Sequence, residues 1–232
     1  MREERKELIG NYLLDEKISE EERKERFEIA WDIWKSFKEI KLSLKQRMLK
    51  ALMNKISSSN EFRGYEVRDG GIEGEQCGSL IILFKKDWLS SGSKIGVLNY
   101  VFDASTHKNV VGIMKQDKGI PFEGDWRKFE NNSNEFLKKC SEKCSEICDN
   151  VLGRGSRRWK VSEWCIAWKW LEDPLYGMWE KEFYLQIMSN DGIERAVNCF
   201  FDELLKLKKE TEGYIDKFIE FIKIHLKAGI EG

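Results

Sequence analysis

The residues best suited to binding chemistry lie together in the segment "GRGSRRWK" at positions 153–160. The segment contains Arg154, Arg157, Arg158, Trp159 and Lys160. Arginine pairs with phosphate or carboxylate through a planar fork of donors, and an indole ring can stack on a nucleobase. The glycines of the segment also let a ligand approach the backbone closely. This combination predicts a site for an anionic ligand, either a nucleotide-like molecule or a nucleic acid.

The tryptophan-rich run that follows also admits a structural interpretation. Written as a strand, it places Trp164, Ile166, Trp168 and Trp170 on one face and Cys165, Ala167 and Leu171 on the other. Both faces are largely apolar, which predicts that the middle of the strand is buried and that most of its tryptophans belong to the core. The preceding cations would then only flank a loop and pair with acids of the next helix. The sequence leaves both interpretations open.

A second basic surface is predicted on a helix. Residues 35–55 contain one acid, Glu39, and seven cations: Lys35, Lys38, Lys41, Lys45, Arg47, Lys50 and Lys55. A helix of this kind can follow a phosphate backbone, and Lys38, Lys41 and Lys45 are the candidates for such a basic face. The alternative is a solvated face that binds nothing.

Three cysteines, Cys140, Cys144 and Cys148, have the residue type of metal ligands but not the usual spacing. They fall four residues apart on one face of a predicted helix, where free cysteine packs as a small apolar side chain. Zinc sites usually take closer ligands from a loop, and the two histidines of the chain, His107 and His225, lie in distant segments. We therefore expect these cysteines in the core, with no bound metal and no cofactor.

Familiar catalytic motifs are missing from the sequence. It contains no nucleophile elbow, no phosphate-binding P-loop and no dinucleotide-binding glycine pattern. A metal-dependent nuclease needs carboxylates beside a lysine, yet the run that holds Lys115 has no acid two residues before it. The sequence therefore favours a protein that is not an enzyme. A divergent nuclease, in which Asp103 and Glu73 meet only in the fold, is the less favoured alternative.

The composition is that of a globular protein without a global basic field. Of the 232 residues, 41% are apolar and 35% are charged, and the net charge is −1. No apolar run approaches the ~18–20 residues that cross a bilayer, and the first ten residues lack the apolar core of a signal peptide. We therefore expect a cytoplasmic protein without a membrane partner, whose six cysteines are free thiols.

Hydrophobic periodicity predicts an N-terminal helical segment. Residues 2–16 and 20–40 have the pattern of helices, and one buried stripe is expected from Phe27, Ala30, Trp31, Trp34 and Phe37. Ser43 is predicted to cap a further helix at 44–56. The run "SSSN" at 57–60 then predicts a boundary between a helical segment, 1–60, and an α+β domain, 61–232, which together can form one compact unit.

The remainder predicts an α+β fold with an antiparallel sheet of about five strands and helices on one side. Short β-rich runs occur at 62–71, 77–89, 94–104 and 109–117, before the tryptophan-rich strand, with hairpin turns expected at 90–94 and 105–109. Such short connections favour an antiparallel meander. Helices are expected at 134–152 and 179–226, the second with a buried stripe of Phe200, Leu204, Leu207, Tyr214, Phe218 and Phe221.

The order of these elements resembles a known family. "KVSEWCIAWKWLEDPLYGMWEKEFYLQIMSND", followed by "IERAVNCFFDELLKLKKETEGYID", resembles the C-terminal half of phage and bacterial proteins of the PD-(D/E)XK nuclease superfamily, over roughly residues 62–222. In that family the nuclease signature lies upstream, where this chain has helices, so no catalytic residue carries over. The resemblance implies a free-standing version of the non-catalytic half, acting in recognition within a phage–bacteria conflict.

These features together predict a non-enzymatic recognition module that binds an anionic small molecule or nucleic acid through residues 154–160. The alternative is a protein-interaction or homo-oligomerisation module, in which the aromatic helix at 20–40 makes the contact.

Overall fold

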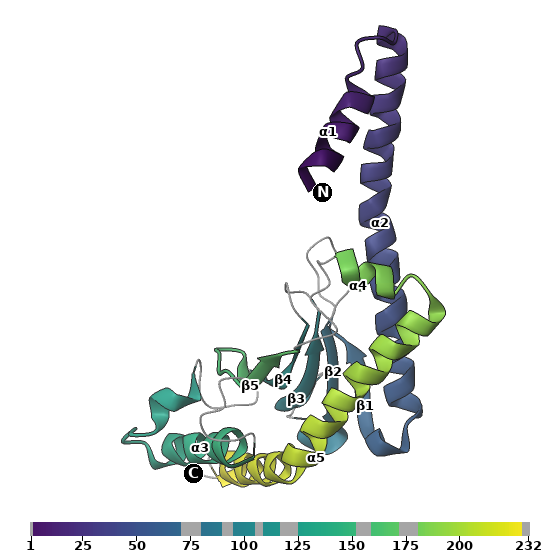
Figure 1. Ribbon diagram of the computed structural model, residues 1–232. Helices are drawn as coiled ribbons and strands as arrows, with labels where there is room; N and C mark the ends of the chain where they lie inside the picture. Colours follow the sequence, from purple (N-terminus) through teal and green to yellow (C-terminus); the bar gives the residue numbers. More distant parts are fainter. Residues whose placement is uncertain are drawn as a thin grey trace. The chain divides into compact units, whose positions relative to one another are not determined.

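The computed structural model describes residues 2–70, 80–89, 95–104, 109–116, 125–151, 159–171 and 181–228 (Figure 1). The chain divides into two compact units, residues 1–44 and 45–232. This division lies earlier than the boundary at residue 60 that the sequence suggests. Residues 45–58 contribute Met48, Leu49, Leu52 and Ile56 to the core and therefore belong with the second unit.

The first unit consists of α1 (Arg2–Leu13) and the beginning of α2 (Glu20–Ser58). Ser19 caps α2, because its hydroxyl oxygen accepts a hydrogen bond from the backbone N–H of Glu22 at 3.1 Å. α1 turns back along α2, and the Arg26 guanidinium donates to the Tyr12 carbonyl oxygen at 2.9 Å. The predicted break at Ser43 is wrong, since α2 runs through it as one helix. No glycine or proline lies between residues 20 and 58 to end the helix.

The second unit is built on a five-stranded antiparallel sheet, which confirms the predicted α+β meander. The strands are β1 (Tyr65–Asp69), β2 (Leu80–Lys85), β3 (Leu98–Asp103), β4 (Val110–Lys115) and β5 (Cys165–Trp170), and they pair in chain order. β1 and β5 are therefore the two edges. The predicted turn at 90–94, and the predicted turn at 105–109 except for its last residue, lie outside the described residues.

One face of the sheet packs against α5 (Asn190–Ala228), which follows the short α4 (Lys181–Gln186). Tyr100 and Phe102 of β3 point to this face: the Tyr100 hydroxyl lies 3.0 Å from the Thr211 hydroxyl, and the Phe102 ring lies 4.5 Å from the Phe200 ring. The predicted stripe is buried at Phe200, Leu204, Leu207 and Phe218. The prediction that Tyr214 belongs to this stripe is wrong, because its side chain is 37% exposed. Phe221 is only half-buried.

The segment before β5 forms α3 (Glu135–Ser145) and the π-helical turn η4 (Glu146–Val151). Asn134 caps α3 by accepting from the backbone N–H groups of Phe136 and Leu137. Cys140 and Cys144 are buried, as predicted, and half-buried Cys148 donates to the Ile166 carbonyl oxygen at 3.1 Å. Short 3-10 turns complete the unit: η1 (Asn60–Phe62), η2 (Lys86–Trp88) and η3 (Trp126–Phe129).

Candidate functional site

β5 and the residues before it form a hairpin at the edge of the sheet, which we call the Trp159–Trp170 hairpin. The backbone of Lys160 makes two hydrogen bonds to the backbone of Trp168, at 2.7 and 2.8 Å. A turn joins the two sides, because the N–H of Ser162 donates to the Cys165 carbonyl and the Ser162 hydroxyl accepts from the Cys165 N–H, both at 3.1 Å. Lys160 therefore covers the otherwise open edge of β5 at Trp168.

The middle of the strand is buried at Ile166 and Ala167, as predicted, but the prediction that most of its tryptophans belong to the core is wrong. Trp164 is 62% exposed and Trp170 is 40% exposed, while Trp159 and Trp168 are half-buried. The exposure of each tryptophan follows from its position in the hairpin. Ile166 in mid-strand is covered by Trp126, whose indole N–H donates to its carbonyl oxygen at 3.1 Å, whereas Trp164 lies in the turn and Trp170 at the strand end.

Cations alternate with these rings. The Lys160 ammonium lies 3.5 Å from the centre of the Trp170 ring and 5.3 Å from that of Trp168, both within cation–π range. The Lys169 ammonium lies 5.2 Å from the Trp159 ring and forms an ion pair with Glu203 at 2.6 Å. Glu203 thus offsets the charge of Lys169, while among the described residues the contacts of Lys160 are to aromatic rings.

Two of the five predicted ligand-binding residues, Trp159 and Lys160, lie in the described hairpin. The Lys160 ammonium contacts the Trp168 and Trp170 rings, whereas Trp159 contacts Lys169, whose side chain points to the other face of β5. Arg154, Arg157 and Arg158 lie outside the described residues. Sequence analysis did not single out Gly112 of β4. Because this residue has no side chain, β5 can approach β4 closely at Trp168. A Cβ atom at position 112 would lie 2.7 Å from the Ala167 carbonyl oxygen and 2.9 Å from the Trp168 Cβ atom.

The cations of the predicted basic helix have separate environments. Lys41 lies in the first unit, with its ammonium 4.7 Å from the Phe37 ring, and Lys45 lies in the second. Burial lowers the pKa of Lys45, although the charge of Asp103 opposes this effect. Lys55 hydrogen-bonds to Asn198 and lies 4.8 Å from the Phe201 ring, so it attaches α2 to α5. The side chain of Lys38 is outside the described set.

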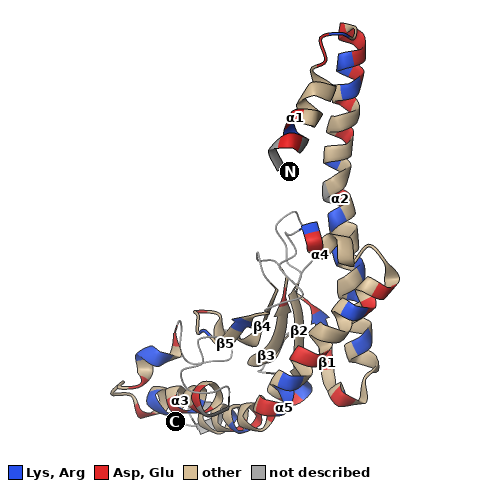
Figure 2. Cartoon of the chain, in the orientation of Figure 1, with Lys and Arg blue, Asp and Glu red and all other residues tan. Residues whose placement is uncertain are grey.

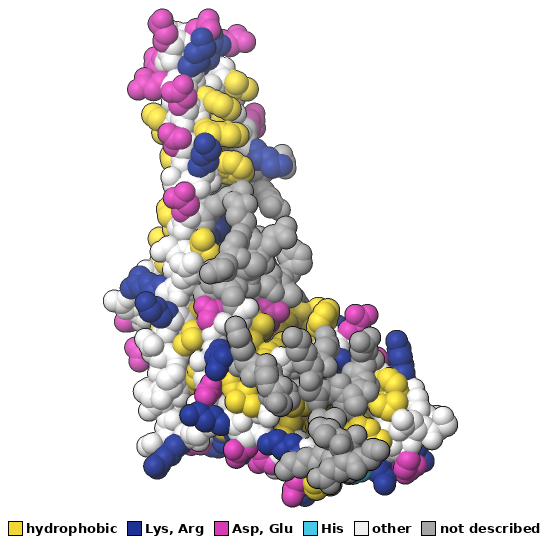
Figure 3. Space-filling model, turned by 180° about the vertical axis from the view of Figure 1, so that it is seen from behind, with side chains coloured by type: hydrophobic (Ala, Val, Ile, Leu, Met, Phe, Trp, Pro, Cys, Tyr) yellow, Lys and Arg dark blue, Asp and Glu magenta, His cyan; other side chains and the backbone are white. Residues whose placement is uncertain are grey.

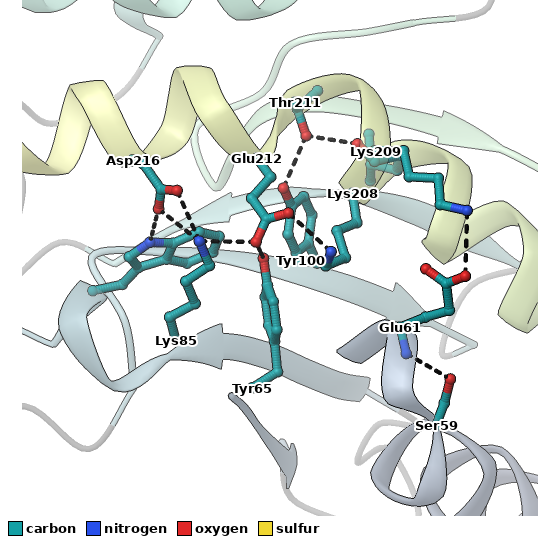
Figure 4. Close-up of polar contacts among 12 residues, drawn as sticks. Ser59, Glu61, Tyr65, Lys85, Tyr100, Lys208, Lys209, Thr211, Glu212 and Asp216 are labelled. Carbon is teal, nitrogen blue, oxygen red and sulfur yellow. Dashed lines mark hydrogen bonds and ion pairs between the residues drawn. The ribbon is translucent and has the colours of Figure 1, made fainter. Parts of the chain in front are cut away.

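A polar cluster that sequence reasoning missed joins α5 to the β1–β2 edge (Figure 4). We call it the α5 polar cluster; it comprises Tyr65, Lys85, Trp88, Lys208, Glu212 and Asp216. The Tyr65 hydroxyl donates to Glu212 at 2.9 Å, and the Lys85 ammonium lies 2.8 Å from Glu212 and 2.7 Å from Asp216. The only local signal was the spacing of residues 208, 212 and 216 along one face of a helix.

The electrostatics of these residues indicate a structural role for the cluster, which holds α5 against β1 and β2. Burial raises the pKa of Glu212, but hydrogen bonds from Lys208, Lys85 and Tyr65 outweigh it and bring the pKa to about 2. Burial lowers the pKa of Lys85, but its hydrogen bonds to Asp216 and Glu212 raise it overall. Burial has the largest effect on Tyr65 and raises its pKa well above the ordinary value. Electrostatic interactions with Tyr100 and Glu212 act in the same direction. Glu212 therefore stays ionised and the Tyr65 phenol stays protonated at neutral pH, so neither group is a base near pH 7.

Two surface depressions flank Lys85, with volumes of about 550 and 450 Å³. The first is lined by three cations, Arg63, Lys85 and Lys86, and by the acids Glu66 and Asp87. The second mixes Asp216 and Glu220 with Lys223. Neither lining has a charge of one sign, so neither depression selects an anion or a cation.

Replacing Glu212 by glutamine should change how stability depends on pH. The folded-state pKa of about 2 lies below the ordinary value of 4.5, so the ionised carboxylate stabilises the fold above pH 4.5. That stabilisation is lost as the pH falls from 4.5 through about 2. Because Glu212 and its ion-pair partners are partly solvated, we expect the Glu212→Gln change to lower the free energy of unfolding by about 1–2 kcal/mol at pH 7. The loss should be much smaller at pH 2.

Urea unfolding at pH 7, 4 and 2.5 measures this difference. Glu210→Gln is the matched control, because Glu210 is exposed two residues earlier on α5 and should change little at any pH. A constant difference between Glu212→Gln and the parent protein across this range would contradict the prediction.

The nuclease alternative, in which Asp103 and Glu73 meet in the fold, stays a prediction. Asp103 pairs with Val110 and Lys115 pairs with Leu98, at opposite ends of the β3–β4 ladder. Glu73 lies outside the described residues. Within the described ranges, no three His, Cys, Asp or Glu side chains gather closely enough to hold a metal ion.

Four of the described thiols, Cys140, Cys144, Cys148 and Cys165, lack the environment of a nucleophile. Burial raises the pKa of Cys140 and of Cys148 to about 12, and that of Cys165 to about 11. Cys144 is raised further by burial and by the neighbouring thiols. These four thiols stay protonated at neutral pH, and a protonated thiol is a poor nucleophile and a poor metal ligand.

Comparison with known proteins gives no relative: no protein-family model, curated protein or solved structure matches the chain. The resemblance to the nuclease superfamily therefore stays a prediction. None of the helices in the described ranges combines the length and the apolar character needed to cross a membrane.

Proposed function

We propose that this protein recognises an anionic, base-containing ligand, a nucleotide or a nucleic-acid segment, through the Trp159–Trp170 hairpin. The observation that supports the proposal is the exposure of two rings in one hairpin: Trp164 in the turn, and Trp170 beside the Lys160 ammonium. Arg154, Arg157 and Arg158 immediately precede this hairpin in the chain and would supply further phosphate contacts.

The physical argument combines two contacts that such ligands need. A nucleobase stacks on an exposed indole whatever its sequence, and cations beside the ring compensate the phosphate charge. An exposed ring in a turn, such as Trp164, is available for stacking without a rearrangement of the core. The proposal is one of recognition without catalysis, since the described residues that flank the hairpin supply neither a reactive thiol nor a carboxylate cluster.

Intrinsic tryptophan fluorescence tests the proposal directly. The probes are mononucleotides, cyclic dinucleotides, and short single- and double-stranded oligonucleotides, each titrated at low salt. We expect saturable quenching that weakens as salt is added, because bound phosphates release counterions. A response to the small probes alone identifies a nucleotide, whereas a response that grows with oligonucleotide length identifies nucleic acid.

Two substitutions test whether the ligand binds at the hairpin. Trp164→Ala should weaken binding about tenfold through the lost stacking contact, and Lys160→Ala should reduce the salt dependence. Tyr214→Ala and Lys206→Ala remove an exposed ring and an exposed cation from α5 and should leave binding unchanged. The proposal is wrong if no probe quenches fluorescence, or if alanine at Arg157 and Arg158 together leaves the affinity intact.

A further inference from the structure

The first unit exposes the apolar side chains that a helical hairpin would normally bury. Twelve large apolar side chains between Leu8 and Leu42 are 47–72% exposed, and none of the side chains described in residues 1–44 is buried. Figure 3 shows hydrophobic side chains standing among charged ones on these helices. The buried stripe predicted from Phe27 to Phe37 is therefore wrong within this unit. A surface of this kind is typical of a binding interface.

The exposed rings on α2 form a row suited to helix pairing. The Phe27 and Trp31 rings lie 6.2 Å apart, and the Trp31 and Trp34 rings lie 5.2 Å apart. Positions 27, 30, 34 and 37 alternate in steps of three and four residues, which is the spacing of the seam between two paired helices. These positions lie in the central part of the segment 20–44.

Charge along the same segment determines which direction of pairing is favourable (Figure 2). Residues 20–32 contain six acids and three cations, whereas residues 33–44 contain three cations and one acid. A parallel pair of such helices would oppose the acidic halves. An antiparallel pair opposes each acidic half with a cationic half, and such complementarity favours one orientation over another.

We propose that residues 20–44 of α2 pair antiparallel with the same segment of a second copy of this chain, about a two-fold axis near Asp32. In this register Phe27 lies opposite Phe37 of the second copy. Trp34 lies opposite Ala30, so that a large ring meets a small side chain. The contact is self-complementary, as a two-fold interface requires, and the segment is about 37 Å long at 1.5 Å per residue. This inference does not depend on the proposed ligand.

Size-exclusion chromatography with light scattering gives the first test. The full chain should be a dimer at micromolar concentration, and Phe37→Glu should weaken the dimer at least a hundredfold. Ile224→Glu is the control, because Ile224 is an equally exposed apolar residue on α5. Circular dichroism shows whether each variant keeps its helices. A parent protein that is monomeric at all concentrations, or a Phe37→Glu variant that dimerises normally, overturns the proposal.

Cross-linking tests the direction of pairing. In a chain with Cys77 and Cys199 replaced by serine, Ile33→Cys should cross-link to its own mate through a short bis-maleimide. Ile40→Cys should not, although it has the same position in the seven-residue pattern, because an antiparallel register separates the two copies of residue 40 by roughly 24 Å along the axis. Equal cross-linking of both variants would indicate a parallel dimer and overturn the proposed arrangement.

Discussion

Phe200→Ala should lower the free energy of unfolding by about 3–5 kcal/mol. Phe200 is fully buried on α5, and its ring lies 4.5 Å from that of Phe102 in the middle of the sheet. Removing the ring loses its transfer from water and leaves a cavity that the packed strands cannot fill. Such a loss is a large share of the ~5–15 kcal/mol that stabilises a typical domain.

Urea unfolding followed by tryptophan fluorescence measures this loss. Tyr214→Ala on the same helix is the matched control, because it removes a ring of similar size from an exposed position and should cost less than about 1 kcal/mol. Equal losses for the two variants would mean that α5 does not cover the sheet with the face that contains Phe200.

Gly192→Ala should destabilise the fold by about 3 kcal/mol or more. A Cβ atom at position 192 would clash with the backbone carbonyl oxygen of Gln186. The obstacle is backbone at the end of α4 rather than a flexible side chain, so either the start of α5 or α4 must move. The turn between them, in which the Ser189 hydroxyl accepts from the Gly192 N–H at 3.0 Å, would be lost as well.

The same substitution at Gly213 should have the opposite sign. Nothing lies within 4 Å of a Cβ atom at this exposed position in the middle of α5. Alanine there should stabilise the helix by about 0.5–1 kcal/mol, because glycine loses more conformational freedom on folding. The urea midpoints of the two variants should therefore move in opposite directions, and a normal midpoint for Gly192→Ala would show that α4 does not end against α5.

The strands and most helices were predictable because their signals are local. Runs rich in β-branched and aromatic residues, interrupted by Gly, Asn and Asp, indicate strands whatever surrounds them. The prediction failed at Ser43, since a serine that can cap a helix is also tolerated within one when no glycine or proline is near. Local sequence therefore marks where a helix can end, and the neighbouring residues decide whether it does.

The site was less predictable because exposure is a property of the fold. The apolar character of Trp164 and Trp170 is visible in the sequence, but what covers them depends on β5 being an edge strand. The α5 polar cluster was missed for a related reason. Its partners Tyr65 and Lys85 lie far from Glu212 in the chain, and no pattern within either segment links them.

The position of α5 in the chain has a consequence for biosynthesis. The ribosome makes all five strands before it makes the helix that covers Leu83, Tyr100 and Phe102. At ~5–20 residues per second, the chain from residue 171 to residue 228 takes roughly 3–12 s to appear. During that time this apolar face of the sheet lacks the helix that covers it. The yield of native protein should therefore depend on translation speed and on chaperones that bind nascent chains, even though every strand pairs with its nearest neighbour in sequence.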